Sequence, residues 1–447
     1  MFLCVCGVLL PNDGQYGRIR ENKERTMKRR DFLKGMAVAG ATASVAGGIG
    51  MIPALFAPRT AHASERNKLI FISDLHMNVD GNYSWLVKHA LDLSRFLTNV
   101  NARSDVAELI ILGDLLDDWV SPAEYTPQTF SDILASNYNN GVVPALQEIC
   151  NNHDIDVTYV VGNHDMLSFE PQNKDIIAKT FPGMTIISDS PGLGAYTKDK
   201  VIWAEHGHRY TLFNAPDTWS RTGGHLPMGY FISRLAASKS LTEGQVYTTP
   251  DVLDQFVKSP AEINNYLQQG GYAGSAGNII DDAFIIAVFN AIAFWSEHWP
   301  WNKFTMNNLD IFTGDPSVEG IAFTYDNIFG GWPTRQDIVD RYEAVLNDLG
   351  HLNSAANLLF EMPDRIKDLY HFTPRIVLFG HTHQPVFQYH SGQVETIYAN
   401  TGTWIDNKPM TWVEVEINDG DDSQRYYTVS LWFYGDSSPK QSGTVSV

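Results

Sequence analysis

The sequence has few cysteines, a deficit of positive charge and no long run of apolar residues. Its three cysteines, Cys4, Cys6 and Cys150, are too few for a disulfide framework. It contains 32 Lys and Arg against 51 Asp and Glu, for a formal net charge of −19. This acidity argues against a general nucleic-acid binder, which needs a basic face. The composition, 44% hydrophobic and 19% charged, is typical of a globular protein and excludes collagen, a disordered chain and a multi-span membrane protein.

Residues 27–63 are predicted to be an export signal. Lys28-Arg29-Arg30 matches the twin-arginine secretion pattern of bacteria, and a Gly/Ala-rich apolar stretch follows. That stretch ends at Ala61-His62-Ala63, the small-x-small pattern that signal peptidases cleave, and it is too poor in Leu and Ile for a good membrane anchor. We therefore expect contacts with the twin-arginine export machinery and signal peptidase, and a periplasmic or otherwise exported protein.

Residues 1–26 lie in front of this signal, and we interpret them as a start-site misassignment with Met27 as the true start. Cleavage after Ala63 would leave Cys150 as the one remaining cysteine, which we expect to be a buried free thiol. It would also remove nine Lys and Arg but only four Asp and Glu, so the mature chain would be more acidic than the precursor.

Five short apolar runs of the mature chain each end in residues of the metal-ligand type. The runs are β-rich, too short for helices and apolar on both faces, as expected of strands buried between layers. Amphipathic helices are predicted between them, at 85–100 and 144–152. This alternation predicts an α/β fold with ligands gathered outside the carboxyl ends of the strands. The runs end at Asp74-Leu75-His76, Gly113-Asp114-Leu115-Leu116-Asp117, Gly162-Asn163-His164-Asp165, Glu205-His206-Gly207-His208 and Gly380-His381-Thr382-His383.

These residue types suit a centre of two divalent metals. Two metals about 3.5–4 Å apart need a carboxylate that can bridge them, together with neutral imidazole and oxygen ligands around each. Carboxylates, an amide oxygen and imidazoles are all present at the strand ends. The candidate ligands are Asp74, Asp114, Asn163, His76, His206, His381 and His383.

In this order, the five blocks resemble the motifs of the calcineurin-like metallophosphoesterases. They extend from Asp74 to His383, and Asn400-Thr401-Gly402-Thr403 resembles a strand-end turn that often follows in the family. The resemblance implies a four-layer α-β-β-α sandwich of two mixed sheets. It also implies a phosphoesterase that hydrolyses phosphate mono- or diesters with a metal-bridging hydroxide as nucleophile.

The resemblance further implies a role for each matching residue. His164 would contact the substrate phosphate or protonate the leaving oxygen, with Asp165 orienting its ring, and Asp117 would orient a metal ligand. Outside what the resemblance implies, His208, Arg209 and Arg221 are each either substrate contacts or surface residues. One metal would be held by Asp74, His76 and His383, and the other by Asn163, His206 and His381, with Asp114 bridging them. Mn, Fe and Zn all suit such ligands.

Within the expected catalytic domain, residues 64–447, residues 211–373 form a long insertion that we expect to be mainly helical and to cap the site. Helices are predicted at 250–267, 281–295 and 336–349. The run at 281–295 is shorter than the ~20 residues of a membrane span, so it is either a buried helix or a lid with apolar surface for a lipid substrate. Aromatic residues of the expected cap include Trp219, Tyr230, Trp295, Trp299, Trp301 and Trp332.

The substrate class remains open between a phosphorylated small molecule and a lipid head group. A narrower enzyme alternative is a lipid-linked phosphodiesterase or pyrophosphatase, because the chain also resembles the UDP-diacylglucosamine pyrophosphohydrolase type. A different class is a non-catalytic binding protein stabilised by metal, which the presence of both His164 and Asp165 argues against. Beyond Asn400, alternating residues at 413–417 and a β-rich run at 424–434 predict an antiparallel hairpin packed on the core.

Overall fold

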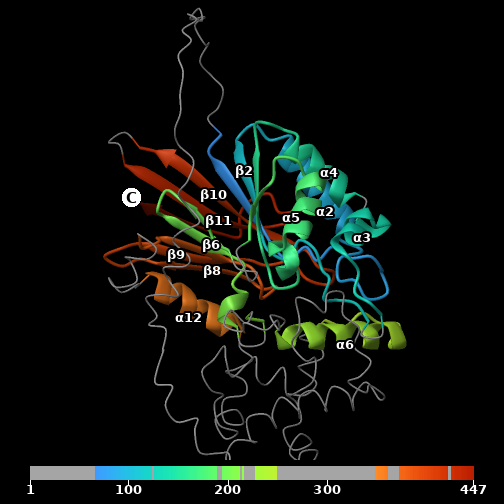
Figure 1. Cartoon of the computed structure of the whole chain (residues 1–447). Helices are drawn as coiled ribbons and strands as arrows, with labels where there is room; N and C mark the ends of the chain where they lie inside the picture. The colour runs from blue at the N-terminus through green and yellow to red at the C-terminus, as the bar shows by residue number, and fades with distance from the viewer. Residues whose placement is uncertain are drawn as a thin grey trace, which may run out of the picture. The chain divides into compact units, whose positions relative to one another are not determined.

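Two β-sheets lie face to face in the computed structural model (Figure 1). The structure describes residues 66–122, 125–139, 141–188, 194–211, 214–215, 227–248, 348–360, 372–420 and 424–447. All of them belong to one unit, Thr60–Met362 with Phe372–Val447. Several predictions therefore lie outside the described residues, namely those on residues 1–26, the export signal, Arg221, the helices at 250–267 and 281–295, most of the helix at 336–349, and every tryptophan expected in the cap.

The first sheet joins the N-terminal strands of the domain to its C-terminal hairpin. Its strand order is β12-β11-β10-β1-β2-β3-β4; β1 to β4 run parallel, and β10, β11 and β12 are antiparallel to their neighbours. The predicted hairpin is therefore confirmed, and it extends the sheet beside β1. The strands are β1 (Lys68–Ile72), β2 (Val106–Leu112), β3 (Asp156–Val160), β4 (Thr185–Ile187), β10 (Thr411–Asp419), β11 (Arg425–Phe433) and β12 (Gln441–Ser446).

The second sheet contains the strands that precede the two C-terminal histidine motifs. Its order is β5-β6-β7-β9-β8, with β6, β7 and β9 parallel and the two edge strands antiparallel. Both sheets are thus mixed. The strands are β5 (Tyr196–Lys198), β6 (Ile202–Glu205), β7 (Ile376–Phe379), β8 (Pro385–His390) and β9 (Thr396–Thr401).

Strand β1 illustrates why these runs are apolar on both faces. Leu69 and Phe71 lie in the core between the two sheets, whereas Ile70 and Ile72 lie in the core between the first sheet and its helices. Successive side chains of a strand point to opposite faces, so a strand covered on both sides has no polar face. The position of the sheet between two layers therefore explains the continuous apolar pattern.

Helices cover the outer face of each sheet, so the predicted four-layer sandwich is confirmed (Figure 1). Helix α12 packs against β7 and β9 of the second sheet, and α2, α4 and α5 cover the first. No helix within the described ranges is long and apolar enough to cross a membrane. The helices are α2 (Ala90–Asn101), α3 (Phe130–Ala135), α4 (Val142–Cys150), α5 (Pro171–Thr180), α6 (Met228–Glu243) and α12 (Asp348–Phe360), with short 3-10 turns η1 (Asn137–Asn139), η2 (Met166–Phe169) and η3 (His208–Tyr210).

The helix predicted at 85–100 begins later, at Ala90. The carboxylate of Asp406 accepts hydrogen bonds from the backbone N–H groups of Val87, Lys88 and His89, at 3.3, 2.9 and 3.0 Å. These donors precede the helix, where backbone N–H groups lack partners and a negative charge is favourable. Asp406, which is distant in sequence, therefore fixes the backbone where the helix begins, and Trp85 lies outside the helix.

Candidate metal centre

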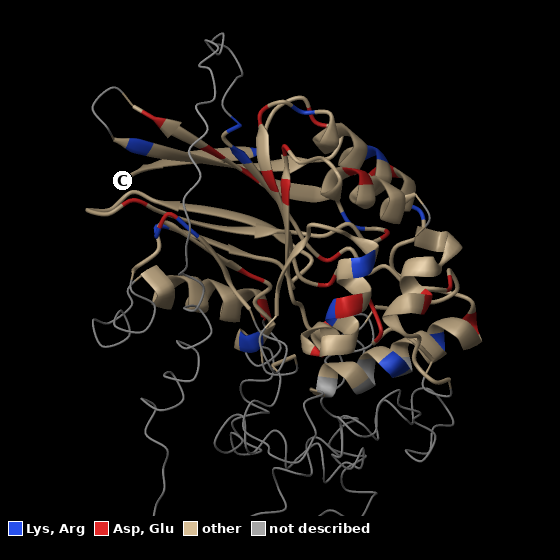
Figure 2. Ribbon diagram, turned by 45° about the horizontal axis from the view of Figure 1, so that its top comes forward, with Lys and Arg blue, Asp and Glu red and all other residues tan. Residues whose placement is uncertain are grey.

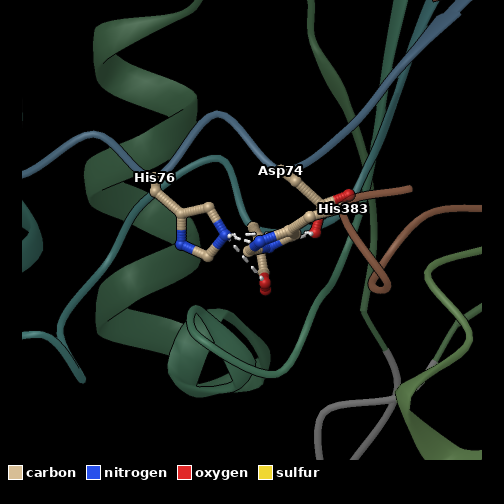
Figure 3. Close-up of side chains that lie close together, drawn as sticks. Asp74, His76 and His383 are labelled. Carbon is tan, nitrogen blue, oxygen red and sulfur yellow. Dashed lines mark hydrogen bonds and ion pairs between the residues drawn. The ribbon is translucent and has the colours of Figure 1, made fainter. Parts of the chain in front are cut away.

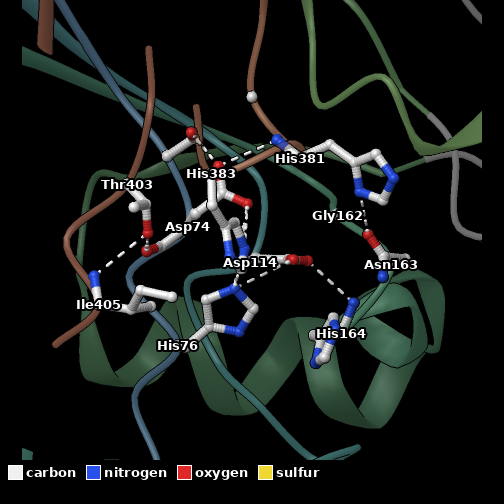
Figure 4. Close-up of polar contacts among 12 residues, drawn as sticks. Asp74, His76, Asp114, Gly162, Asn163, His164, His381, His383, Thr403 and Ile405 are labelled. Carbon is white, nitrogen blue, oxygen red and sulfur yellow. Dashed lines mark hydrogen bonds and ion pairs between the residues drawn. The ribbon is translucent and has the colours of Figure 1, made fainter. Parts of the chain in front are cut away.

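The carboxyl ends of β1, β2, β3, β6 and β7 meet at one place, and Figure 4 shows residues of the first, second, third and fifth motifs there. Backbone hydrogen bonds join the motif loops: Asp74 N donates to Gly113 O at 3.1 Å, and Gly380 N donates to His206 O at 3.0 Å. The ring of His206 then connects the sheets, since its Nδ1 donates to Leu112 O at 2.7 Å. The predicted convergence of the motifs is thus present in the fold.

Five of the seven candidate ligands have a left-handed backbone. Their φ values are 55° at Asp74, 48° at His76, 52° at Asp114, 73° at His381 and 56° at His383. Such angles are uncommon for residues other than glycine, although Asp and His are enriched among the exceptions, and they concentrate at functional sites. Here they end each strand abruptly, and the side chains turn toward a common centre.

The glycines of the motifs are required by close contacts around the carboxylates. A Cβ on Gly162 would lie 2.1 Å from Asp114 Oδ1, and a Cβ on Gly380 would lie 2.5 Å from Ser73 Oγ and 2.8 Å from Asp74 Oδ2. All three distances are far below van der Waals contact. The absence of a side chain therefore lets the backbone approach the two central acids.

One group of side chains surrounds Asp74 (Figure 3). His383 Nε2 lies 3.2 Å from Asp74 Oδ1 and 3.0 Å from His76 Nε2. Together with Asp114, these residues each place one ligand-type atom within 4.8 Å of the others. Asp74 Oδ1 is buried and has no hydrogen-bond partner among the described residues. A bare carboxylate oxygen facing imidazole nitrogens fits a divalent cation of the Mn, Fe or Zn kind.

A second group surrounds Asn163. Its Oδ1 lies 2.9 Å from His206 Nε2 and 3.0 Å from His381 Nδ1. Asp114 stands between the two groups, because its Oδ2 lies 3.3 Å from His206 Nε2 and 3.5 Å from His76 Nε2. One carboxylate oxygen thus faces both sets of candidate ligands, which is the geometry that a bridging ligand needs.

Hydrogen bonds at the other ring nitrogen orient two of these histidines. His76 Nδ1 contacts Asp117 Oδ2 at 2.8 Å, and His206 Nδ1 donates to Leu112 O at 2.7 Å. An acceptor at Nδ1 holds a proton there, so Nε2 is the ring nitrogen available to a metal. Both Nε2 atoms face Asp114, so each ring presents its free nitrogen to the centre.

The two histidines differ in charge. Burial lowers the pKa of His76, and this effect outweighs the opposing hydrogen bond from Asp117. Burial also acts to lower the pKa of His206, but the charges of Asp114 and Asp74 raise it to about 9. Burial opposes ionisation of Asp114 as well, yet His206 and His164 hold its pKa well below the usual range. The metal-free centre is therefore a set of buried, charged and neutral groups that compensate one another.

His164 lies beside this centre, and its ring partner differs from the predicted one. Its Nδ1 contacts Asp117 Oδ1 at 2.9 Å, whereas Asp165 was expected to orient the ring. Asp117 is itself fixed by the backbone N–H groups of Trp119 and Val120, at 3.1 and 2.8 Å. Burial lowers the pKa of His164, but the charges of Asp117 and Asp114 outweigh burial and raise it to about 8.

Asp165 instead connects two motif loops. Its carboxylate accepts hydrogen bonds from the backbone N–H groups of Gly162 and Leu115, both at 2.7 Å, and from Leu116 at 3.2 Å. Burial, reinforced by the charge of Asp114, raises its pKa to about 7. In this structure Asp165 therefore holds the second and third motifs together, and Asp117 contacts both His76 and His164.

Comparison with known families agrees with this geometry. Residues 68–267 match the model of the calcineurin-like phosphoesterases, and residues 26–46 match the signal sequence of the twin-arginine translocation pathway. Residues 68–267 are therefore similar to the calcineurin-like phosphoesterases. Its signal sequence directs export by the twin-arginine route, as predicted. The matched span holds the first four motifs, and the fifth, Gly380–His383, follows later in the chain and reaches the same site through β7.

Among solved structures, the chain is similar to a dimetal phosphatase from Danio rerio. The two share 12% identity with a TM-score of 0.32, over 86% of this chain and 99% of that one. A likeness at this level carries no argument about the reaction. No curated protein matches the chain.

Two tryptophans, Trp85 and Trp119, flank His164 and were not predicted. The Trp119 ring lies 4.6 Å from the His164 ring, and Trp85 lies 5.2 Å from it on centroid distances. Trp85 also lies 4.8 Å from His76 and 5.9 Å from His383, and its Nε1 donates to Tyr247 O at 3.2 Å. Nothing in the sequence distinguishes these residues, because their role depends on where their loops fold.

The weaker substrate candidates have different surroundings. His208 is buried, with its ring 5.4 Å from that of His206. The guanidinium of Arg209 pairs with Glu205, at 2.6 Å from Nε and 2.8 Å from Nη2.

Acidic and basic residues are interspersed over the described strands and helices (Figure 2). Of the expected cap, Tyr230 on α6 contacts the Trp119 ring at 5.9 Å.

The turn after β9 supports the first motif, as Figure 4 shows for Thr403. Thr403 Oγ1 donates to Asp74 O at 2.9 Å, and Asn400 Nδ2 donates to Gly380 O at 2.6 Å. Thr401 Oγ1 lies 2.6 Å from Ser73 Oγ, and the Ser73 hydroxyl donates in turn to Asp74 Oδ2. The Asn-Thr-Gly-Thr segment therefore fixes the strand ends that carry Asp74 and His381.

Proposed function

We propose that this protein is an exported phosphoesterase that uses two divalent metal ions to hydrolyse phosphate monoesters or diesters. The observation that carries the proposal is the position of Asp114. Its Oδ2 lies 3.5 Å from His76 Nε2 on one side and 3.3 Å from His206 Nε2 on the other. His164, held by Asp117, lies beside the same carboxylate, since its backbone N donates to Asp114 Oδ1 at 2.8 Å.

The donor sets suit the metals. Asp74, His76 and His383 would hold one ion, and Asn163, His206 and His381 the other, with Asp114 shared. When bound, two such ions would lower the pKa of a coordinated water from 15.7 to about 7 and neutralise charge on the phosphate oxygens. The protein's contribution is to present free ring nitrogens and bare carboxylate oxygens in a buried, preorganised site.

His164 would act on the substrate. Because its Nδ1 is engaged by Asp117 Oδ1 at 2.9 Å, the ring presents Nε2 to a ligand. In the metal-free site the pKa of His164 is raised to about 8, and a protonated imidazole could donate to a phosphate oxygen or to the leaving oxygen. Asp117 stabilises that charge and holds the ring in place. The intact His164–Asp117 pair favours an enzyme over a binding protein that is merely stabilised by metal.

Electrostatic attraction for an anionic phosphate would come chiefly from the metals. The chain has a net charge of −19, and Arg209 is paired with Glu205. A phosphate therefore approaches a protein of like sign, and the metal centre supplies the local positive charge. Folded export by the twin-arginine route is compatible with loading metal before secretion.

The test is hydrolysis of p-nitrophenyl phosphate and bis-(p-nitrophenyl) phosphate by the purified protein with Mn²⁺. We expect turnover of at least one substrate, and His164→Ala should lower kcat by about 10²–10⁴-fold while two Mn²⁺ remain bound. His153→Ala, an exposed histidine away from the site, is the matched control. No turnover with any divalent metal would refute the enzyme, and full activity of His164→Ala would refute its catalytic role.

A further inference from the structure

Both ring nitrogens of His381 are engaged, and only one of them faces the metal centre. Nδ1 lies 3.0 Å from Asn163 Oδ1, within the second group of candidate ligands. Nε2 points the other way and lies 3.0 Å from the hydroxyl oxygen of Thr211. The state of the far nitrogen decides whether the near one can bind a metal, because a neutral imidazole has one N–H and one lone pair.

The hydrogen bonds of Thr211 favour the tautomer that binds a metal through Nδ1. Its hydroxyl donates its one hydrogen to His208 O at 3.0 Å, so toward His381 the oxygen can only accept. Asn214 Nδ2 lies 3.3 Å from Nε2, and it also donates to Thr211 Oγ1 at 3.4 Å, so this amide has an acceptor other than the His381 ring. When Nδ1 binds a metal ion, Nε2 must carry the ring hydrogen, and Thr211 Oγ1 is placed to accept it.

A carboxylate reinforces the same tautomer. Asp348 Oδ2, at the start of α12, lies 3.6 Å from His381 Nε2. The His381 side chain is 5% exposed and that of Asp348 is 32% exposed, so the pair is partly screened from water. A negative charge behind a metal-ligating imidazole favours the proton on the far nitrogen and raises the basicity of the near one.

Thr211 and Asp348 belong to the segment 211–373 and not to the five motifs. The elements beside these two residues are in contact, because α12, which begins at Asp348, packs against η3, the turn that precedes Thr211. We propose that Thr211 and Asp348 are positioning residues for His381, and that through it the insertion sets the affinity of the second metal ion. The inference rests on the dinuclear centre of the proposed function.

The first experiment titrates Mn²⁺ into metal-free protein by calorimetry and follows the electron paramagnetic resonance spectrum, in which two neighbouring Mn²⁺ ions couple. Thr211→Val keeps the shape of the side chain but removes the acceptor. We expect the dissociation constant of one Mn²⁺ to rise about 10–100-fold and that of the other to stay within twofold, with loss of the coupled signal at two equivalents. Thr211→Ser should restore both. Thr428→Val, the same substitution on β11, where the hydroxyl pairs with that of Thr444, is the matched control.

Asp348→Ala supplies an independent test, because Asp348 is partly exposed and its loss leaves the hydrogen bond of Thr211 intact. It should weaken the same Mn²⁺ by about tenfold, the lower end of such effects, and Asp175→Ala on the exposed face of α5 should not. If Thr211→Val unfolds, judged by its melting temperature, Asp348→Ala and Thr211→Ser decide the question.

The two proposals fail in different ways. If the parent protein binds two Mn²⁺ and both Thr211→Val and Asp348→Ala retain its two dissociation constants, the positioning role is wrong and the dinuclear enzyme stands. Equal weakening of both Mn²⁺ ions would also overturn it, since the effect would then be general. If the parent protein binds fewer than two Mn²⁺, the dinuclear centre itself is refuted.

Discussion

The two halves of the candidate metal centre are supported by different parts of the chain. Around Asp74, the outer contacts come from the motifs and from the turn after β9: Asp117 holds His76, and Thr403 holds the Asp74 backbone. Around His381, the outer contacts come from Thr211 and Asp348 in the long insertion. The first half is thus completed by the core of the fold, whereas the second also depends on a segment outside the motifs.

The halves also differ in the protonation of their histidines. Burial lowers the pKa of His76, so this ring is neutral and ready to bind a cation. His206 has a pKa of about 9, because Asp114 and Asp74 outweigh its burial. A metal entering the second half must therefore displace a proton, and one entering the first half need not. Ligands of the same type therefore differ in protonation because the charges around them differ.

Substitution of Asp114 should weaken the binding of both metal ions, because this residue is shared by the two halves. Because its Oδ2 faces both groups, Asp114→Asn removes a shared negative charge, and we expect both Mn²⁺ ions to bind more weakly. Activity should fall by about 10³-fold or more, equivalent to several kcal/mol of lost charge stabilisation. Calorimetry with Mn²⁺ and kcat/KM check this. Selective loss of one ion would show that Asp114 belongs to one half only.

Substitution of Asp117 should weaken the binding of the first metal ion and leave that of the second unchanged. Asp117→Asn cannot accept from both His76 and His164, so we expect about 10–100-fold weaker binding of the first Mn²⁺ and a lower kcat, with the second Mn²⁺ unaffected. Asp118→Asn is the matched control, because burial and the charge of Asp117 raise the pKa of Asp118 well above its usual range, and an amide resembles the neutral acid. Equal effects at both metals would contradict the division.

The pH dependence should be the smallest effect and should fall on the second half. Between pH 7 and 8, affinity for the second Mn²⁺ should rise by up to about tenfold as His206 loses its proton, while the first changes less. Conversely, protonated His206 stabilises the metal-free fold. This contribution to stability is complete below pH 6.5 and is lost as the pH rises through 9. Calorimetry in buffers of different ionisation enthalpy measures the released proton. A pH-independent second site would refute this assignment.

Much of this arrangement could be predicted before the structure, because strand-end chemistry is local. An apolar run followed by Asp74-Leu75-His76 or Gly380-His381-Thr382-His383 fixes both the strand and the ligand types. The β-hairpin near the C-terminus could likewise be predicted from alternation. The hydrogen-bond partner of His164 could not be predicted, because Asp117 and Asp165 are both candidates in their motifs. Only the left-handed turns and the hydrogen bonds of each carboxylate decide which one contacts the ring.

The sequence by itself determined the export signal, the α/β class and the identity of the candidate ligands, because these depend on composition and on spacing along the chain. The tertiary structure decided which ligands share Asp114, why Trp85 lies against three histidines, and how Thr211 and Asp348 come to face His381. Those contacts join residues far apart in sequence, and they exist only where two sheets bring their strand ends together. Side-chain direction at such a junction depends on packing and backbone angle, which spacing along the chain does not encode.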